Sequence, residues 1–71
     1  MIEAGQTLRF TEHPWRTLRV LGFQPGTVNG LGLALVDEYF EGRQVETGLT
    51  SQSGLESLLA HGRLELVENG R

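Results

Sequence analysis

The sequence has 71 residues, of which 38% are hydrophobic and 21% are charged, with a formal net charge of -3 at pH 7. This length predicts a single domain over residues 1–71. The acidic balance argues against a general nucleic-acid binder, whose affinity comes largely from cations that neutralise phosphates. The absence of cysteine excludes disulfides and thiolate metal sites. So short a chain buries a small core, and a homodimer is one way to stabilise it.

The N-terminal residues lack a basic segment followed by a long apolar run, so the sequence predicts no signal peptide. No stretch approaches the roughly 18 apolar residues of a membrane-spanning helix. We therefore expect a cytoplasmic protein with no membrane partner. All six basic residues are arginine and isoleucine occurs once, a bias typical of a GC-rich bacterial coding sequence.

The first predicted strand covers residues 7–12, TLRFTE. Apolar and polar residues alternate in it, with Leu8 and Phe10 on one face, which is the period of a half-buried strand. Pro14 has no N–H to donate to a strand ladder and restricts the residue before it to extended geometry. Residues 12–14 are therefore expected to form a corner.

A second strand is predicted over residues 15–23, WRTLRVLGF. Leu18 and Val20 lie on one face of this strand, while Trp15 and Phe23 lie among the residues of the other face. If the first face packs in the core, the second face is partly exposed and apolar. Exposed apolar surface of this kind usually marks an interface.

Two turn signals follow this strand, and they predict different registers. A turn at residues 25–26, Pro-Gly, places Leu18 opposite Leu33, whereas a turn at residues 29–30, Asn-Gly, places Leu18 opposite Glu41. The first register pairs apolar residues with apolar residues, so it is favoured.

The middle of the chain, residues 31–40, reads LGLALVDEYF and favours a strand. Two alternatives remain open here. The first concerns the turns described above, which a long glycine-rich loop over residues 22–30 would replace. The second is a helix at about 31–40 in place of the strand, which would make the fold α+β. Glycine in the first helical turn weakens the second alternative. Residues 41–43 then predict a tight turn, and residues 44–50 a short strand that could lie at a sheet edge.

A short helix is the clearest local signal. Ser53 and Glu56 have the spacing of a capping box, which predicts a helix over residues 54–61. Gly62 follows at the position where a left-handed residue commonly ends a helix. The apolar face of this helix would consist of Leu55, Leu58 and Leu59.

The last predicted strand covers residues 63–68, with Leu64 and Leu66 directed inward. The predicted order is thus four strands, a short helix and one strand. This order resembles that of the small SH3-like barrels, and it predicts a mainly β fold of about five strands. The resemblance is one of element order and carries no specific residues, so no function follows from it.

Catalytic and metal chemistry find little support in the sequence. Its serines lie in or near the predicted helix start, with no oriented base beside them. The carboxylates of Asp37, Glu38 and Glu41 are better explained as a solvated hairpin end. The two histidines, His13 and His61, are far apart in sequence and have no neighbouring ligand on a shared helical face. We therefore predict a non-enzyme without cofactor or metal.

Five residues are predicted to form a binding surface: Trp15, Arg16, Phe23, Tyr39 and Phe40. Tryptophan, tyrosine and arginine are enriched at the energetic centres of protein interfaces. We expect an interaction or adaptor module that binds a protein partner or itself. The alternative is a small barrel that binds single-stranded nucleic acid through stacked aromatic residues and arginines.

Overall fold

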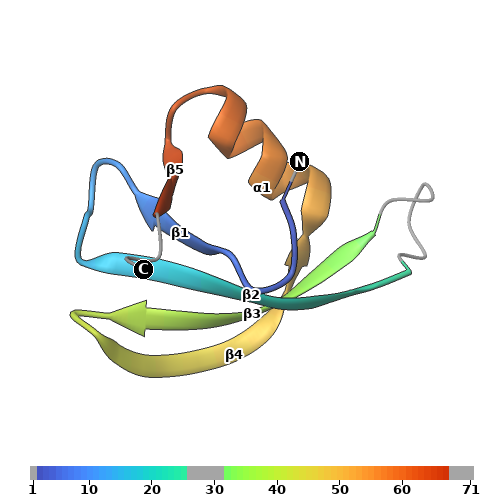
Figure 1. The fold of residues 1–71 in the computed structure, drawn as a ribbon, viewed down its shortest axis with the longest axis horizontal. Coiled ribbons are helices and arrows are strands. Elements are labelled where there is room, and N and C mark those ends of the chain that lie inside the picture. Colours follow the sequence, from blue (N-terminus) through green and yellow to red (C-terminus); the bar gives the residue numbers. More distant parts are fainter. Residues whose placement is uncertain (1, 26–31, 68–71) are drawn as a thin grey trace.

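The fold is a five-stranded antiparallel sheet with one helix packed over its concave face (Figure 1). The computed structural model describes residues 2–25 and 32–67. The order of elements confirms a mainly β fold with one helix before the last strand. The elements are β1 (Thr7–Phe10), β2 (Arg16–Gln24), β3 (Leu33–Phe40), β4 (Arg43–Ser51), α1 (Gln52–Ala60) and β5 (Leu64–Val67).

The strands are arranged in the order β4-β3-β2-β1-β5. Within residues 2–25 and 32–67, β4 and β5 each pair with one neighbour and not with each other, so the sheet is open. The closed form of a barrel is therefore not shown. The helical alternative for residues 31–40 is wrong, because residues 33–40 form strand β3, which lies between β4 and β2.

The corner between the first two strands is confirmed. β1 ends at Phe10 and β2 begins at Arg16, and the Arg16 N–H donates to the His13 carbonyl at 2.8 Å. This bond closes the chain around Pro14, which has no N–H of its own to donate. Trp15 lies in the turn, one residue before the strand in which it was predicted.

The favoured register of β2 and β3 is wrong. Leu18 pairs with Glu38, not with Leu33 or Glu41. Gln24 pairs with Leu33, whereas a turn centred on residues 25–26 or 29–30 would pair it with residue 27 or 35, so the observed register fits neither prediction. The predicted turns at 25–26 and 29–30 fall mostly or wholly outside the described residues. The prediction failed because it took the register from the position of a turn and from apolar matching, whereas Leu18 pairs with the charged Glu38.

An irregularity in β2 also shifts the register between Val20 and Gly22, and we call it the β2 bulge. One extra residue on a bulged strand reverses the alternation of its side chains relative to the partner strand. Val20 pairs with Val36 before the bulge, and Phe23 pairs with Ala34 after it. Phe23 therefore shares the concave face with Ala34, and the predicted placement of Phe23 on the opposite face is wrong.

The core lies between the concave face of the sheet and α1. Leu8 and Val20 are completely buried, and Leu64 is 2% exposed. Leu66 was also predicted to face inward but is 53% exposed, although its partner across the sheet, Leu8, is completely buried. The buried residues among those described are Ile2, Leu8, Leu18, Val20, Ala34, Val36, Leu55 and Leu64.

The helix begins two residues earlier than the capping box predicted. Ser51, the last residue of β4, is the N-cap, and its hydroxyl accepts from the Gly54 N–H at 3.1 Å. The predicted cap, Ser53, instead lies with its hydroxyl 3.0 Å from that of Ser51. Extended backbone at Ser51 suits both the end of a strand and an N-cap, so β4 passes directly into α1.

The C-terminal end of α1 agrees with the prediction. Gly62 has a φ of 75°, in the left-handed region that favours glycine. Its N–H donates to the Leu59 carbonyl at 3.1 Å, and the Arg63 N–H donates to the Leu58 carbonyl at 2.8 Å. This pair of bonds is the Schellman motif, which satisfies carbonyls at the end of a helix.

Candidate binding groove beside strand β4

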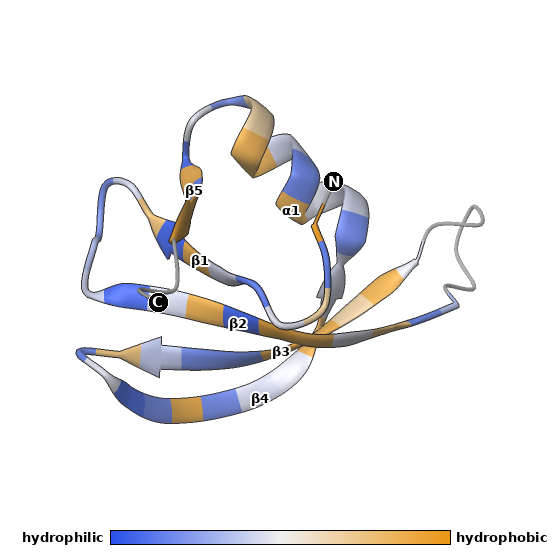
Figure 2. Ribbon diagram, in the orientation of Figure 1, coloured by the Kyte–Doolittle hydropathy of each residue, from blue (hydrophilic) through white to orange (hydrophobic). Residues whose placement is uncertain are grey.

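Strand β4 presents small and polar side chains to the concave face, where β2 and β3 present apolar ones. Ala34 and Val36 of β3 are both buried. Cross-strand partners share a face of a sheet. Most of β4 is hydrophilic or neutral, in contrast to the hydrophobic bands of the central strands (Figure 2). The β4 residues that pair with concave residues of β3 are Glu46, Gly48 and Thr50.

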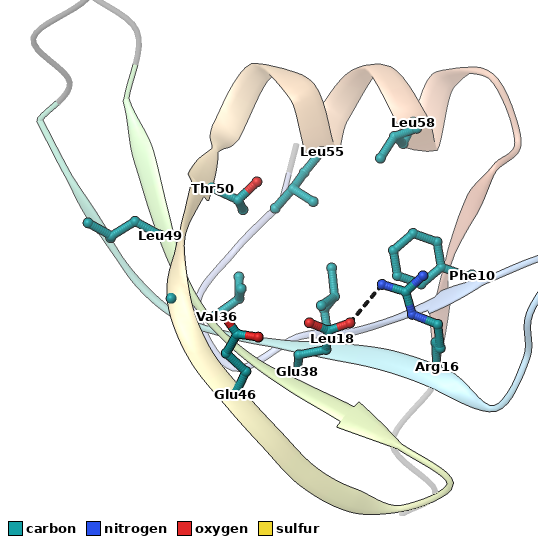
Figure 3. A pocket seen from close by; sticks show the side chains of 11 residues that line it. Phe10, Arg16, Leu18, Val36, Glu38, Glu46, Leu49, Thr50, Leu55 and Leu58 are labelled. Carbon is teal, nitrogen blue, oxygen red and sulfur yellow. Dashed lines mark hydrogen bonds and ion pairs between the residues drawn. The ribbon is translucent and has the colours of Figure 1, made fainter.

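A groove of about 270 Å³ lies between this part of β4 and the helix (Figure 3). Leu55 and Leu58 reach down from α1, and Leu18 and Val36 form the apolar floor. A Cβ atom added at Gly48 would meet no atom within 4 Å. The groove therefore exists because β4 places no bulky side chain beneath the helix at this position.

The charged part of the groove contains one arginine and two glutamates. Arg16 Nη2 lies 2.7 Å from Glu38 Oε2, and its guanidinium carbon lies 4.6 Å from the centroid of the Phe10 ring. Glu38 is directly opposite Glu46 in the sheet. Glu46 makes no side-chain hydrogen bond or ion pair with the residues the structure describes. Two like charges therefore share one face, and Arg16 is bonded to one of them.

The groove continues into a second hollow of about 200 Å³ at the corner between β1 and β2. Phe10, Arg16 and Leu58 line both spaces, so the stacked Arg16–Phe10 pair lies where they meet. The further residues that line the second hollow are Glu12, His13 and Arg63.

Three of the five predicted binding residues lie together near this junction. Arg16 pairs with Phe40 across β2 and β3, and the Trp15 carbonyl accepts from the Glu41 N–H at 2.7 Å. Trp15 and Phe40 are 45% and 44% exposed. The His13 ring packs edge-on against Trp15, with the ring centroids 5.3 Å apart. Exposed aromatic side chains thus extend the surface beyond the groove.

The other two predicted residues lie elsewhere. Tyr39 pairs with Thr17, so it is on the convex face, opposite to Arg16. Phe23 is on the concave face but near the far end of β2, seven residues from Arg16, which is roughly 23 Å along a strand. The structure therefore does not bring Phe23 or Tyr39 to the groove.

The sequence analysis missed the residues that shape the groove, above all Gly48, Glu46 and Leu58. One signal was available: glycine inside a strand is unfavourable and often marks a place where another backbone or a ligand comes close. That Leu58 and Gly48 line the same groove could not be read from the sequence, because it depends on how α1 folds back over the sheet.

Within residues 2–25 and 32–67, no three or more His, Cys, Asp or Glu side chains are grouped to hold a metal ion. None of the helical structure described there is long and apolar enough to cross a membrane. Comparisons of the chain with models of protein families, with curated proteins and with solved structures found no match. The function is therefore argued from the geometry of the groove.

The two opposed glutamates predict different effects on stability. Glu46→Gln is expected to raise the free energy of unfolding by about 0.5 kcal/mol, because it removes the repulsion of like charges directly opposite each other. Glu38→Gln removes the same repulsion but also the ion pair to Arg16, so it is expected to be the less stable variant. Urea unfolding at low salt measures the difference, which should shrink in high salt. Equal stability of the two variants would contradict this prediction.

Proposed function

We propose that the protein is a non-catalytic interaction module that binds an extended segment of a partner protein alongside β4. The observation that carries the proposal is the free edge of β4 beside the groove. β4 has nine residues, most of them exposed, and within the described residues it pairs with β3 alone. An unpaired strand edge offers a row of N–H and C=O groups to an added strand, whose alternate side chains enter neighbouring pockets.

The aromatic residues near the end of the groove support a longer contact surface. Trp15 and Phe40 are exposed, and Arg16, which lines the groove, follows Trp15 in the chain and pairs with Phe40 across the sheet. Tryptophan and arginine often dominate the energy of protein interfaces. We propose that a segment bound along β4 contacts these three residues at one end. Tyr39 and Phe23 do not line the groove, so their role in binding stays a prediction from the sequence.

The lining of the groove supports binding over catalysis. It is mostly apolar and includes no serine, cysteine or histidine, and its one hydroxyl group, on Thr50, has no imidazole base beside it in the lining. Its arginine and one of its glutamates already bond each other. Apolar walls with a few charged groups are typical of a site that recognises a ligand and holds its orientation.

Single-stranded nucleic-acid binding, the alternative function, has less support. Binding of this kind needs arginines that are free to meet phosphates along a groove. In this fold two arginines of β1 and β2 form ion pairs with carboxylates, and the third lies directly opposite an aspartate in the sheet. The facing pairs are Arg9–Glu65 at 2.8 Å, Arg16–Glu38 at 2.7 Å, and Arg19 opposite Asp37 in the register of β2 and β3.

The likeness to SH3-like barrels is a proposal about the fold. It is supported by the order of the elements and by the curvature of the sheet, whose β1–β5 end stands beside α1 (Figure 1). A bacterial source and a cytoplasmic location stay predictions from the sequence.

Two glycines allow a matched test of the proposed site. Gly48 and Gly22 both lie in strands, neither has a left-handed φ, and a Cβ atom on either would meet nothing within 4 Å. Gly48→Glu places a charged side chain inside the groove beside two existing carboxylates, whereas Gly22→Glu changes the charge equally at the β2 bulge, away from the groove.

The experiment begins with the selection of peptides from a displayed random library on the immobilised protein. Gly48→Glu is expected to weaken the selected peptides at least about tenfold, a loss of roughly 1.4 kcal/mol, while Gly22→Glu leaves their affinity unchanged. Circular dichroism checks that both variants are folded. The proposal fails if no peptide is enriched, or if both variants bind the selected peptides equally well.

A further inference from the structure

Resting on the proposed function, we infer what the bound segment must contain. We propose that it carries an apolar side chain that enters the groove above Gly48 and a lysine or arginine two residues away that pairs with Glu46. The apolar groove binds the apolar side chain, and the carboxylates of Glu38 and Glu46 favour a positively charged side chain beside it.

The spacing follows from the geometry of β4. Glu46 and Gly48 are two residues apart and both pair with concave residues of β3. Successive side chains of a strand point to opposite faces, so residues two apart share a face. A strand added alongside β4 has the same period. Two of its residues that are separated by one residue can therefore lie beside Gly48 and Glu46 on the same face.

The position over Gly48 suits an apolar side chain. Leu18 and Val36 form the floor of the groove, and Leu55 and Leu58 form its opposite wall. All of these side chains except that of Leu58 are buried. A polar group placed among them would lose its hydration without gaining a partner. Aliphatic or aromatic side chains instead gain from the burial of apolar area.

The position over Glu46 suits a cation. Glu38 and Glu46 together carry two negative charges, and Arg16 supplies one positive charge through its bond to Glu38. The sum is a net charge of -1 at this end of the groove. A lysine or arginine removes the repulsion between the opposed glutamates, whereas an acidic side chain adds to it.

A second copy of the chain fits the groove less well. The β4 residues from Glu46 to Ser51 read ETGLTS and contain no basic side chain. Two copies paired edge to edge through this stretch of β4 would bring a second pair of carboxylates, Glu38 and Glu46 of the other copy, toward the same region. We therefore commit to a partner protein with a basic and apolar segment, and a homodimer becomes an outcome of the test.

The test uses three acetylated threonine-rich peptides that differ only in the position or the charge of one ionisable residue. The first carries leucine and, two positions later, arginine. The second moves the arginine next to the leucine, which sends it to the other face of an extended strand. The third replaces the arginine of the first by glutamate. Chemical shifts of the ¹⁵N-labelled protein at low salt give the affinities and show where each peptide binds.

We expect the first peptide to bind about tenfold more tightly than either of the others, with shifts on β4 and α1. Glu46→Gln should remove most of that advantage, and Glu46→Lys should reverse it in favour of the glutamate peptide. Rescue by charge reversal distinguishes recognition from a change in folding. Higher salt should weaken the first peptide most, because the pair with Glu46 is electrostatic.

Three results would overturn the inference. If all three peptides bind equally and Gly48→Glu abolishes their binding, the groove binds peptides without this charge preference, and the proposed function survives. If no peptide binds while library peptides do, the sequence requirement is wrong. If light scattering shows a dimer that Gly48→Glu dissociates, the groove is covered by a second copy.

Discussion

Leu55→Ala is expected to lower the free energy of unfolding by about 3 kcal/mol, because it leaves a cavity between α1 and the sheet. Leu55 is 4% exposed and is the one buried residue of α1, where it joins the core that the central strands form. Leu58 and Leu59 of the same helix are half-buried at the margin of this core. Loss of Leu55 therefore weakens the main attachment of the helix.

The effect is large relative to the total stability of so small a domain. At roughly 0.05–0.15 kcal/mol per residue, a chain of 71 residues is stabilised by about 4–11 kcal/mol. Urea unfolding followed by circular dichroism measures the loss. Leu66→Ala is the matched control, because Leu66 is 53% exposed and its truncation should cost less than about 1 kcal/mol. Equal losses for the two variants would show that α1 does not depend on Leu55.

Gly48→Val is expected to make the protein more stable and to abolish peptide binding. Glycine inside a strand is destabilising by roughly 0.5–1 kcal/mol relative to alanine, because it loses more backbone freedom on folding. At Gly48 there is space for a Cβ atom, and the neighbours across the groove are apolar. Valine suits a strand and would bury its methyl groups against Val36. We expect a gain of about 1 kcal/mol or more.

The same methyl groups would occupy the groove, so the affinity of selected peptides should fall at least about tenfold. Thermal unfolding and peptide titration on the same sample measure the two effects. Gly22→Val serves as the control, since it adds the same side chain outside the groove and should leave peptide binding unchanged. A Gly48→Val protein that binds peptides normally would show that the groove is not the site, whatever its stability.

The residues behind these expected effects support the proposed function. Two residues on the inner face of β4 are unfavourable for stability. Gly48 leaves space under the helix, and Glu46 lies directly opposite the like charge of Glu38. Residues that break the local rules for a stable strand are expected at functional positions, where stability is given up for binding. An inward charge on an edge strand also discourages pairing between copies, which agrees with a hetero-partner.

Local patterns in the sequence determined the elements and several of their ends. The alternation around Leu8, the restriction imposed by Pro14 and the left-handed residue Gly62 each depend on neighbours within a few positions, so they could be predicted without the fold. The strand at residues 33–40 and the helix before the last strand were predicted on the same basis.

Contacts between distant segments decided the rest. The length of the connection after Gln24 and the β2 bulge set the register of β2 and β3, and the end of β4 at Ser51 set the helix cap. The groove is lined by residues from distant segments, among them Phe10 of β1, Gly48 of β4 and Leu58 of α1. No local pattern encodes such a meeting, because it depends on how the curled sheet brings its edge beneath the helix.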